Sequence, residues 1–456
     1  MTEVPPRRPR SSSIVLYAAA GGFLLGARGI AALASEAGDG RAVGWLIGGS
    51  LLLLIPSLVL WQQLPRLPGR RRDLWIIIGV ALLARLPLLP LEPALSDDLY
   101  RYLWDGRVQE AGLNPYGVSP LDPSLDAVEA GWPLDERVRE RVNHPGIATI
   151  YPPGLELTFA AVARLGGGME LWKGALLLAE ALLTLLLLRG LRLLGRDPRL
   201  VLLYLWPPLP LIEVAWSAHA ELLAVLPFVW GAITLTEGRH LTAGLAIGAS
   251  IAAKLLPVGF LATLLRRGGL LAALGCLAAL VHFTLPYLGS TDPARAFAGL
   301  GEYAEGWYFN DLLFEPLGRI LSIDPTDRTL LATRILRLAL AGAWLGVALL
   351  SARQAPIASA LTLTVAFVLL SPTVHPWYLL WVLPFAVLLE ARPWWILAGT
   401  TLIAHEVSAG WLAAQVWSPS ETRGFVYGAP LLLLAAHRGA GCWEDRRIAR
   451  VGEKSA

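Results

Sequence analysis

Two adjacent acids, Asp97 and Asp98, directly follow an apolar stretch, and Arg101 comes within one helical turn of them. A carboxylate that an arginine holds at a membrane surface can act as a general base or orient an acceptor hydroxyl. The same pattern also fits a helix start, in which Ser96 caps the first turn and the helix dipole favours both acids. Both interpretations can be true together, so the two carboxylates are candidates for catalysis.

Lys254 is an isolated cation in the apolar run 252–257. An ionisable side chain inside a bilayer costs roughly 2.5–3.5 kcal/mol on insertion scales and is a functional candidate by default. Its natural partner would be an anion such as a lipid phosphate. The alternative is a lysine that snorkels to the membrane interface, and snorkelling is what we expect of Arg85.

The other candidates are polar and aromatic residues at the ends of apolar stretches. His375 could bind phosphate or sugar, and the aromatic cluster around Asn310 is suited to stacking on a sugar. A polar helix end or an aromatic belt at the membrane interface explains these residues about as well as a substrate contact does. The candidates are Tyr102, Tyr151, His219, Glu221, Asn310, His375 and Trp377.

The composition excludes a soluble enzyme. The chain has 456 residues, of which 55% are hydrophobic and 16% are charged, whereas soluble domains carry roughly 25% charged residues. The two cysteines, Cys276 and Cys442, lie too far apart in the sequence for a CxxC metal site. The sequence contains no nucleotide-binding motif, so a sugar donor must come from the bilayer.

The apolar residues occur in blocks that are long enough to cross a bilayer as helices. We therefore expect an all-α polytopic membrane protein, a bundle of about 12–14 transmembrane helices with a long first extracytoplasmic loop. Two apolar blocks, 152–168 and 241–265, are ambiguous. The candidate spans are 14–34, 43–64, 73–91, 171–190, 199–216, 219–236, 269–288, 329–351, 356–372, 376–390, 393–413 and 424–437.

Arginine placement orients these blocks. Arginines gather in the N-terminal tail 7–10 and in the loop 66–72, which predicts that both are cytoplasmic. The long polar segments 92–150 and 289–328 then lie outside the cytoplasm. The first of them holds eleven acids against five arginines, which fits translocation.

Two topologies are open for the middle of the chain. If 152–168 and 241–265 both cross the membrane, the arginine-rich segment 189–199 faces outward, against the usual tendency of arginines. If both are short re-entrant hairpins, opening outward and inward respectively, this segment is cytoplasmic and Lys254 lies at the tip of the second hairpin. Irregular backbone at that depth is tolerated where protein or a cavity covers it. We favour the second topology.

In these motifs the chain resembles the GT-C superfamily of integral-membrane glycosyltransferases, and more narrowly the bacterial polyprenyl-phosphate-mannose-dependent mannosyltransferases. The resemblance rests on motifs that follow one another over residues 73–390. They are Ser96-Asp97-Asp98, Arg101-Tyr102-Leu103-Trp104-Asp105-Gly106-Arg107, Asn114-Pro115-Tyr116, Tyr151-Pro152-Pro153, Lys254 with Pro257, and His375-Pro376-Trp377-Tyr378. The hairpin 14–64 precedes what the family treats as its first span.

The resemblance implies a catalytic base in the first outer loop, here Asp98 or Asp97, with Asp98 favoured by its spacing to Arg101. It also implies cations that hold the lipid phosphate, and Lys254, Arg101 and His375 match that role. We expect no cofactor, and no ligand set in the sequence requires a metal.

The activity that the resemblance implies is inverting transfer of a sugar, with mannose expected, from a polyprenyl-phosphate donor to an extracytoplasmic glycan or lipid. The alternative is a transporter or flippase of a lipid-linked sugar. We expect a multi-pass protein of the cell membrane, with its active site on the extracytoplasmic side and no nucleic-acid partner. We divide the chain into an N-terminal hairpin (1–72), a catalytic membrane module (73–390) and C-terminal helices with a cytoplasmic tail (391–456).

Overall fold

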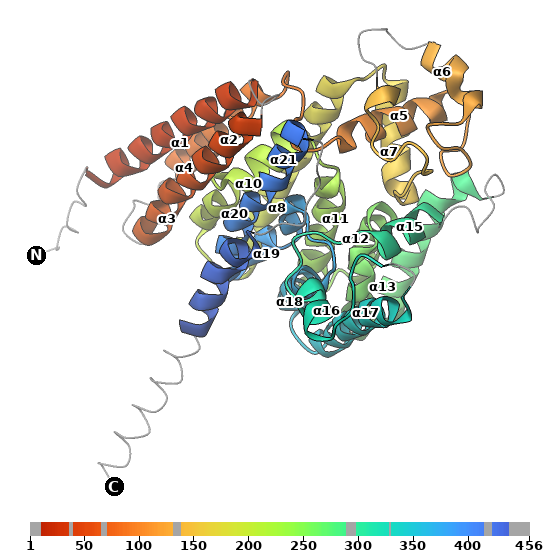
Figure 1. Cartoon of the computed structure of the whole chain (residues 1–456). Helices are drawn as coiled ribbons and strands as arrows, with labels where there is room; N and C mark the ends of the chain where they lie inside the picture. The colour runs from red at the N-terminus through yellow and green to blue at the C-terminus, as the bar shows by residue number, and fades with distance from the viewer. Residues whose placement is uncertain are drawn as a thin grey trace, which may run out of the picture.

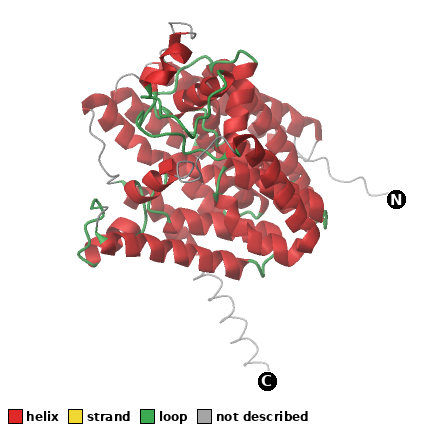
Figure 2. Ribbon diagram, turned by 90° about the vertical axis from the view of Figure 1, so that its right-hand side faces the viewer, coloured by secondary structure: helices red, strands yellow, loops and turns green. Residues whose placement is uncertain are grey.

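A computed structural model of the chain describes residues 11–35, 40–64, 71–130, 138–288, 298–327, 330–414 and 422–436. These residues form helices and loops, and they contain no β-strand; a single parallel bridge joins Phe309 to Thr373. The helices pack into one bundle (Figure 2), with α1–α4 on one side and α5–α7 at a far corner (Figure 1). The predicted all-α fold class is confirmed.

The helices follow one another with short connections. In the N-terminal part they are α1 (Ser11–Ser35), α2 (Gly40–Leu52), α3 (Leu54–Gln63), α4 (Arg71–Leu83), η2 (Leu86–Leu88), α5 (Asp98–Glu110), η3 (Pro123–Leu125), α6 (Asp126–Ala130), η4 (Arg139–Arg141), α7 (Pro153–Arg164) and α8 (Met169–Leu193). In the middle they are η5 (Pro198–Val201), α9 (Leu202–Leu205), α10 (Pro208–Pro210), η6 (Leu211–Trp216), α11 (Glu221–Thr236), α12 (His240–Ala253), η7 (Leu256–Phe260), α13 (Leu261–Thr284) and η8 (Leu285–Tyr287). The last are α15 (Ala298–Gly306), α16 (Phe314–Ile320), α17 (Leu331–Ser351), α18 (Pro356–Leu370), η9 (Pro376–Trp381), α19 (Leu383–Leu388), α20 (Arg392–Thr400), η10 (Thr401–His405), α21 (Glu406–Ala414) and Arg423–Ala436.

Within the described ranges, four helices are long and apolar enough to cross a membrane. They are Val43–Gln63, Met169–Leu193, Leu256–Tyr287 and Leu331–Ser351, and a fifth candidate is the pair Pro198–Leu205 and Pro208–Trp216, which is bent by 53°. Other apolar helices have only 10–17 residues, because prolines and irregular turns divide the apolar blocks. The predicted total of 12–14 spans therefore stays a prediction.

The block 241–265 contains a hairpin. Helix α12 runs from His240 to Ala253, and the chain then turns back so that Gly268 lies beside His240. Gly269 adopts φ 59° and ψ −153°, a backbone conformation that glycine takes without steric cost. The chain is kinked there, and the segment beyond the kink packs against α12, with Gly248 against the backbone of Cys276. Lys254 is therefore at the tip of the hairpin.

The block 152–168 does not cross the bundle. Its helix α7 packs along α5, where Gly106 meets the Phe159 carbonyl so closely that a side chain would not fit. The start of α7 meets the tip of the hairpin at Gly154, which lies against the Ala252 carbonyl. Trp172, just after α7, contacts Tyr102 on α5. Both ends of α7 therefore stay on the side of the bundle that holds α5.

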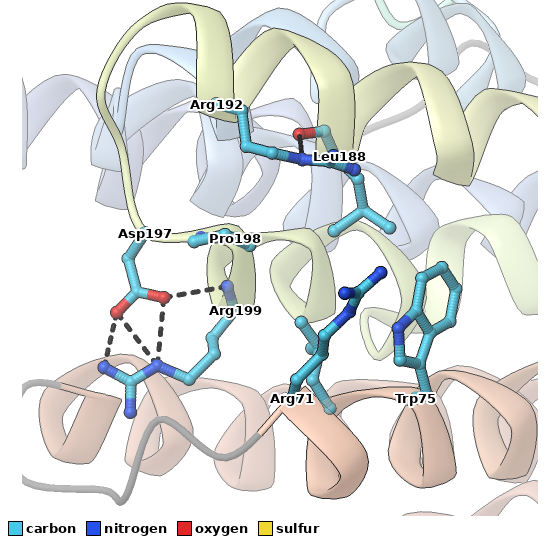
Figure 3. A pocket seen from close by; sticks show the side chains of 8 residues that line it. Arg71, Trp75, Leu188, Arg192, Asp197, Pro198 and Arg199 are labelled. Carbon is cyan, nitrogen blue, oxygen red and sulfur yellow. Dashed lines mark hydrogen bonds and ion pairs between the residues drawn. The ribbon is translucent and has the colours of Figure 1, made fainter.

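Arginines from two distant parts of the chain line one pocket. Arg71 at the start of α4 lines it together with Arg192 in the last turn of α8 and Arg199 in η5 (Figure 3). The second topology expected such arginines on one side of the membrane, and which blocks cross a membrane stays a prediction. That topology was wrong in one respect, because the block 152–168 holds the single helix α7 and not a hairpin.

Arg85 is buried and does not snorkel, so that expectation was wrong. Its side chain is 0% exposed, and its guanidinium donates two hydrogen bonds of 2.8 Å to the Glu180 carboxylate on α8. It also donates to the carbonyls of Ala81 and Leu205. The pair joins α4, α8 and α9, and the arginine needs no contact with the interface because its counter-ion lies inside the bundle.

Candidate active site

Asp98 begins α5 and points its carboxylate at two hydrogen-bond donors. Asn143 Nδ2 donates to Asp98 Oδ1 at 3.2 Å, and the Tyr102 hydroxyl donates to Asp98 Oδ2 at 3.4 Å. The predicted helix start is close to that observed: Ser96 Oγ accepts the Asp98 backbone N–H at 3.3 Å, while Asp97 occupies the N-cap position. Asp98 is thus held in a fixed direction, partly buried, at the first turn of the helix.

Asp97 differs from its neighbour because its side chain is exposed. Desolvation by the surrounding protein and the adjacent Asp98 carboxylate raise the pKa of Asp97, and the nearby Arg141 opposes this effect. The two acids are therefore not equivalent in structure. One faces protein donors, and the other faces outward.

The spacing led us to expect that Arg101 holds Asp98, but it does not. Its Nε lies 2.9 and 3.0 Å from the two carboxylate oxygens of Asp105, one helical turn onward, and its Nη2 donates to the Ile147 carbonyl at 2.9 Å. The side chain of Arg101 is 7% exposed. Asp105 lies one turn onward on the same helix face, and the bond to Ile147 ties α5 to the loop before α7.

Lys254 reaches back over the residues that precede α7. Its Nζ lies 2.7 Å from Glu221 Oε1 and 4.9 Å from the centre of the Tyr151 ring. The lysine side chain is 24% exposed, while Glu221 is 1% exposed. Glu221 Oε2 has no hydrogen-bond partner in the described part of the chain. The ammonium group therefore has a counter-ion and is still accessible.

Tyr102 and Tyr151 connect the acid to the cation. Their ring centres are 5.3 Å apart in an edge-on arrangement. Tyr102 contacts the Asp98 carboxylate, and Tyr151 lies under the Lys254 ammonium. The Tyr102 hydroxyl also accepts the Ala220 N–H at 3.4 Å, one residue before Glu221. The candidates from α5, α7, α11 and α12 thus converge on one pair of rings.

His219, Trp377 and His375 form a stack of three rings. His219 lies 3.8 Å from the Trp377 ring centre, and His375 lies 4.3 Å from it on an almost parallel plane. His219 directly precedes Ala220, whose N–H donates to the Tyr102 hydroxyl, and this hydroxyl contacts Asp98. The ring stack therefore borders the same site as the acid and the cation.

A buried carboxylate stands behind this stack. Glu213 Oε2 lies 3.0 Å from His219 Nδ1, and Glu213 Oε1 lies 2.7 Å from His405 Nε2. Sequence reasoning missed His405. An ionisable residue within an apolar block is the signal that singled out Lys254, and the same signal applies to His405.

Asn310 supports the loop that carries His375. Its side-chain Nδ2 donates to the Val374 carbonyl at 3.2 Å. Its backbone carbonyl accepts a hydrogen bond from the Tyr427 hydroxyl at 2.9 Å. Backbone hydrogen bonds between Phe309 and residues 372 and 374 continue this contact. The side chain is 0% exposed, so the structure brings Asn310 next to the site through the His375 loop.

No group of three or more His, Cys, Asp or Glu side chains within the described ranges could hold a metal ion. The predicted independence of metals is not tested by this observation and stays a prediction.

Comparison with known proteins identifies two matching family models. The model described as Alpha-(1->6)-mannopyranosyltransferase, N-terminal domain, matches residues 13–266, and the one described as MptB C-terminal domain matches residues 314–423. The first match includes the hairpin 14–64. No curated protein and no solved structure matches the chain significantly. Because the first match alone covers more than half of the 456 residues, the chain belongs to the Alpha-(1->6)-mannopyranosyltransferase family, a family of mannosyltransferases.

Proposed function

We propose that the protein transfers mannose from a polyprenyl-phosphate donor to a hydroxyl group of a glycan or lipid, with inversion at the anomeric carbon. The observation that carries the proposal is the position of Asp98 and Lys254 on either side of the Tyr102–Tyr151 pair. In this proposal, a proton acceptor and a cation that could bind phosphate therefore border the same pair of rings. The family match does not favour the transporter alternative.

In the proposed reaction, the Asp98 carboxylate takes the proton of the acceptor hydroxyl as its oxygen bonds to the anomeric carbon. The bond from this carbon to the phosphate oxygen breaks, and polyprenyl phosphate leaves with the electron pair. A cation in a site of low dielectric stabilises the charge that develops on the phosphate. Lys254 is suited to this because its ammonium is accessible and has hydrogens to donate.

Asp98 is a better base than Asp97 in this proposal for a geometric reason. Asn143 and Tyr102 donate to Asp98 and fix its direction, whereas Asp97 is exposed and acts as the N-cap residue of α5. Arg101 would act indirectly, by fixing α5, because Asp105 already engages its guanidinium.

The aromatic and polar neighbours would bind the sugar and the phosphate. We propose that Tyr102, Tyr151 and Trp377 contact the mannose ring and that His375 helps Lys254 to hold the phosphate. His219, Glu221 and Asn310 would hold these groups in place, because each contacts one of them or its loop. The arginine-rich end of the bundle would face the cytoplasm, which puts this site on the extracytoplasmic side.

The test compares Asp98→Asn with Asp97→Asn in membrane vesicles that contain radiolabelled polyprenyl-phosphate mannose and a hydroxyl acceptor. Loss of a general base reduces kcat by roughly 10²–10⁴-fold, and we expect this loss for Asp98→Asn only. Both variants are to be checked for folded protein by gel filtration in detergent. Full mannose transfer by Asp98→Asn would reject Asp98 as the base. If only Asp97→Asn loses transfer, Asp97 is the base instead.

A further inference from the structure

A pocket lies at the other end of α8, away from the candidate active site. Its volume is about 350 Å³, and α4, α8 and η5 form its walls (Figure 3). Trp172 at the start of α8 contacts Tyr102, while Leu188 near the end of α8 lines the pocket. These two residues are 16 positions apart, or about 24 Å along a helix axis, so the pocket is separate from the active site.

Three arginines and one acid line this pocket: Arg71, Arg192, Arg199 and Asp197. Asp197 is already paired, because both of its carboxylate oxygens accept hydrogen bonds from Arg199. Arg71 and Arg192 have no acidic partner within the described ranges, and Arg192 donates only its Nε, to the Leu188 carbonyl at 3.1 Å. Two positive charges in the pocket are therefore not compensated.

The other arginines of the same connection are compensated. Arg189 pairs with Glu237 at 2.5 Å, and Arg196 pairs with Glu390 at 2.5 Å. Within the described ranges, the chain thus provides acids for Arg189, Arg196 and Arg199 but none for Arg71 and Arg192. Arginines that only anchor the chain at the membrane interface would not need to differ in whether they are paired with acids.

The walls of the pocket are partly apolar. Leu74 and Trp75 of α4 line it beside Arg71, and Trp75 is 41% exposed. Figure 3 shows Arg71 and Trp75 rising from α4 toward the segment that carries Arg192. Cations next to an exposed tryptophan at the end of membrane-length helices match the position of a lipid headgroup. A free phosphate ion would use the arginines but not the apolar wall.

We infer that this pocket binds the phosphate headgroup of an anionic phospholipid in the leaflet on the arginine-rich side. Arg71 and Arg192 donate to the phosphate oxygens, for which the planar guanidinium is well shaped. Leu74 and Trp75 contact the glycerol and the first part of the acyl chains. This inference does not depend on the reaction proposed above.

The test is a titration of the purified full chain in detergent with phosphatidylglycerol. Binding is measured from the rise in Tm and from the lipid that native mass spectrometry finds retained on the protein. One arginine near a membrane contributes about fivefold to lipid affinity, so Arg71→Gln with Arg192→Gln should weaken apparent affinity about 25-fold. Arg196→Gln removes the same charge from the same connection and should leave affinity within about twofold, because Glu390 already neutralises it.

Phosphatidylcholine and inorganic phosphate are the comparison ligands, and both should bind much more weakly than phosphatidylglycerol. Equal binding of phosphatidylcholine would overturn the role of the charges, and equal binding of inorganic phosphate would overturn the role of the lipid. Unchanged phosphatidylglycerol binding in the double variant would overturn the site itself. If that variant does not fold, Arg71→Gln alone serves the same purpose, since this side chain is exposed.

Discussion

The two ends of α8 use charge in opposite ways. At the end near Trp172, two half-buried or buried side chains have acidic partners: Lys254 has Glu221, and His219 has Glu213. At the end near Leu188, the exposed Arg71 and Arg192 line a pocket and have no acidic partner within the described ranges. Buried charges must be paired because desolvation is costly, whereas exposed charges can be left available to a ligand. The first end therefore suits the chemistry that we propose, and the second suits the anionic lipid that we propose.

The largest expected effect concerns the buried pair between these ends. Replacing Glu180 by Gln leaves the charge of Arg85 buried without a counter-ion, and the free energy of unfolding should fall by about 3–5 kcal/mol. Glu237→Gln breaks the partly exposed pair with Arg189. This substitution should lower the free energy of unfolding by less than about 1 kcal/mol. Thermal unfolding in detergent measures both, and similar losses would contradict the contrast between buried and exposed charges.

A second prediction concerns the cation at the active-site end. Lys254→Gln removes a charge-assisted hydrogen bond to the donor phosphate, worth about 1.5–3 kcal/mol, so the apparent KM for polyprenyl-phosphate mannose should rise at least about tenfold. The double variant with Glu221→Gln separates two explanations. If Lys254 only neutralises Glu221, the double variant recovers the KM; if it binds phosphate, the KM stays high.

Salt should separate the two ends further. Surface charges are screened when the ionic strength rises from 0.01 M to 0.15 M, while partly buried pairs are screened much less. Binding of phosphatidylglycerol at the Arg71 pocket should weaken several-fold over this range, and the KM of the sugar donor should change by less than about twofold. Equal salt sensitivity would show that the two sites do not differ in exposure as described.

The smallest effect is expected at Asp97, whose pKa is raised in the folded chain. A raised carboxyl pKa means that ionisation is less favourable in the folded than in the unfolded state, so the stability that it contributes is present at low pH and lost as pH rises. Asp97→Asn should therefore raise Tm slightly at pH 7. Below the ordinary carboxyl pKa the gain should vanish, and a gain that persists there would have another cause.

Local patterns were enough to predict several features of this protein. Long apolar blocks predicted an all-α membrane protein, and the isolated Lys254 marked a candidate position at the tip of a hairpin. The acids 97 and 98 predicted the start of a helix, which begins at Asp98. These features depend on hydrophobicity and on residues close in sequence, and both can be evaluated along one chain.

The partners of the charged side chains were harder to predict from the sequence. Spacing predicted that Arg101 holds Asp98, but Arg101 contacts Asp105. Arg85 was expected at the membrane interface, but it is buried and pairs with Glu180. His405 reaches Glu213 from 192 positions away. The energy of a buried charge depends on which counter-ion the fold brings within about 3 Å, because attraction in a low dielectric is strong only at contact distance. The sequence alone therefore determined which residues are candidates and that the helices lie in a membrane, whereas tertiary structure decided which charges are neutralised and which stay free for a ligand.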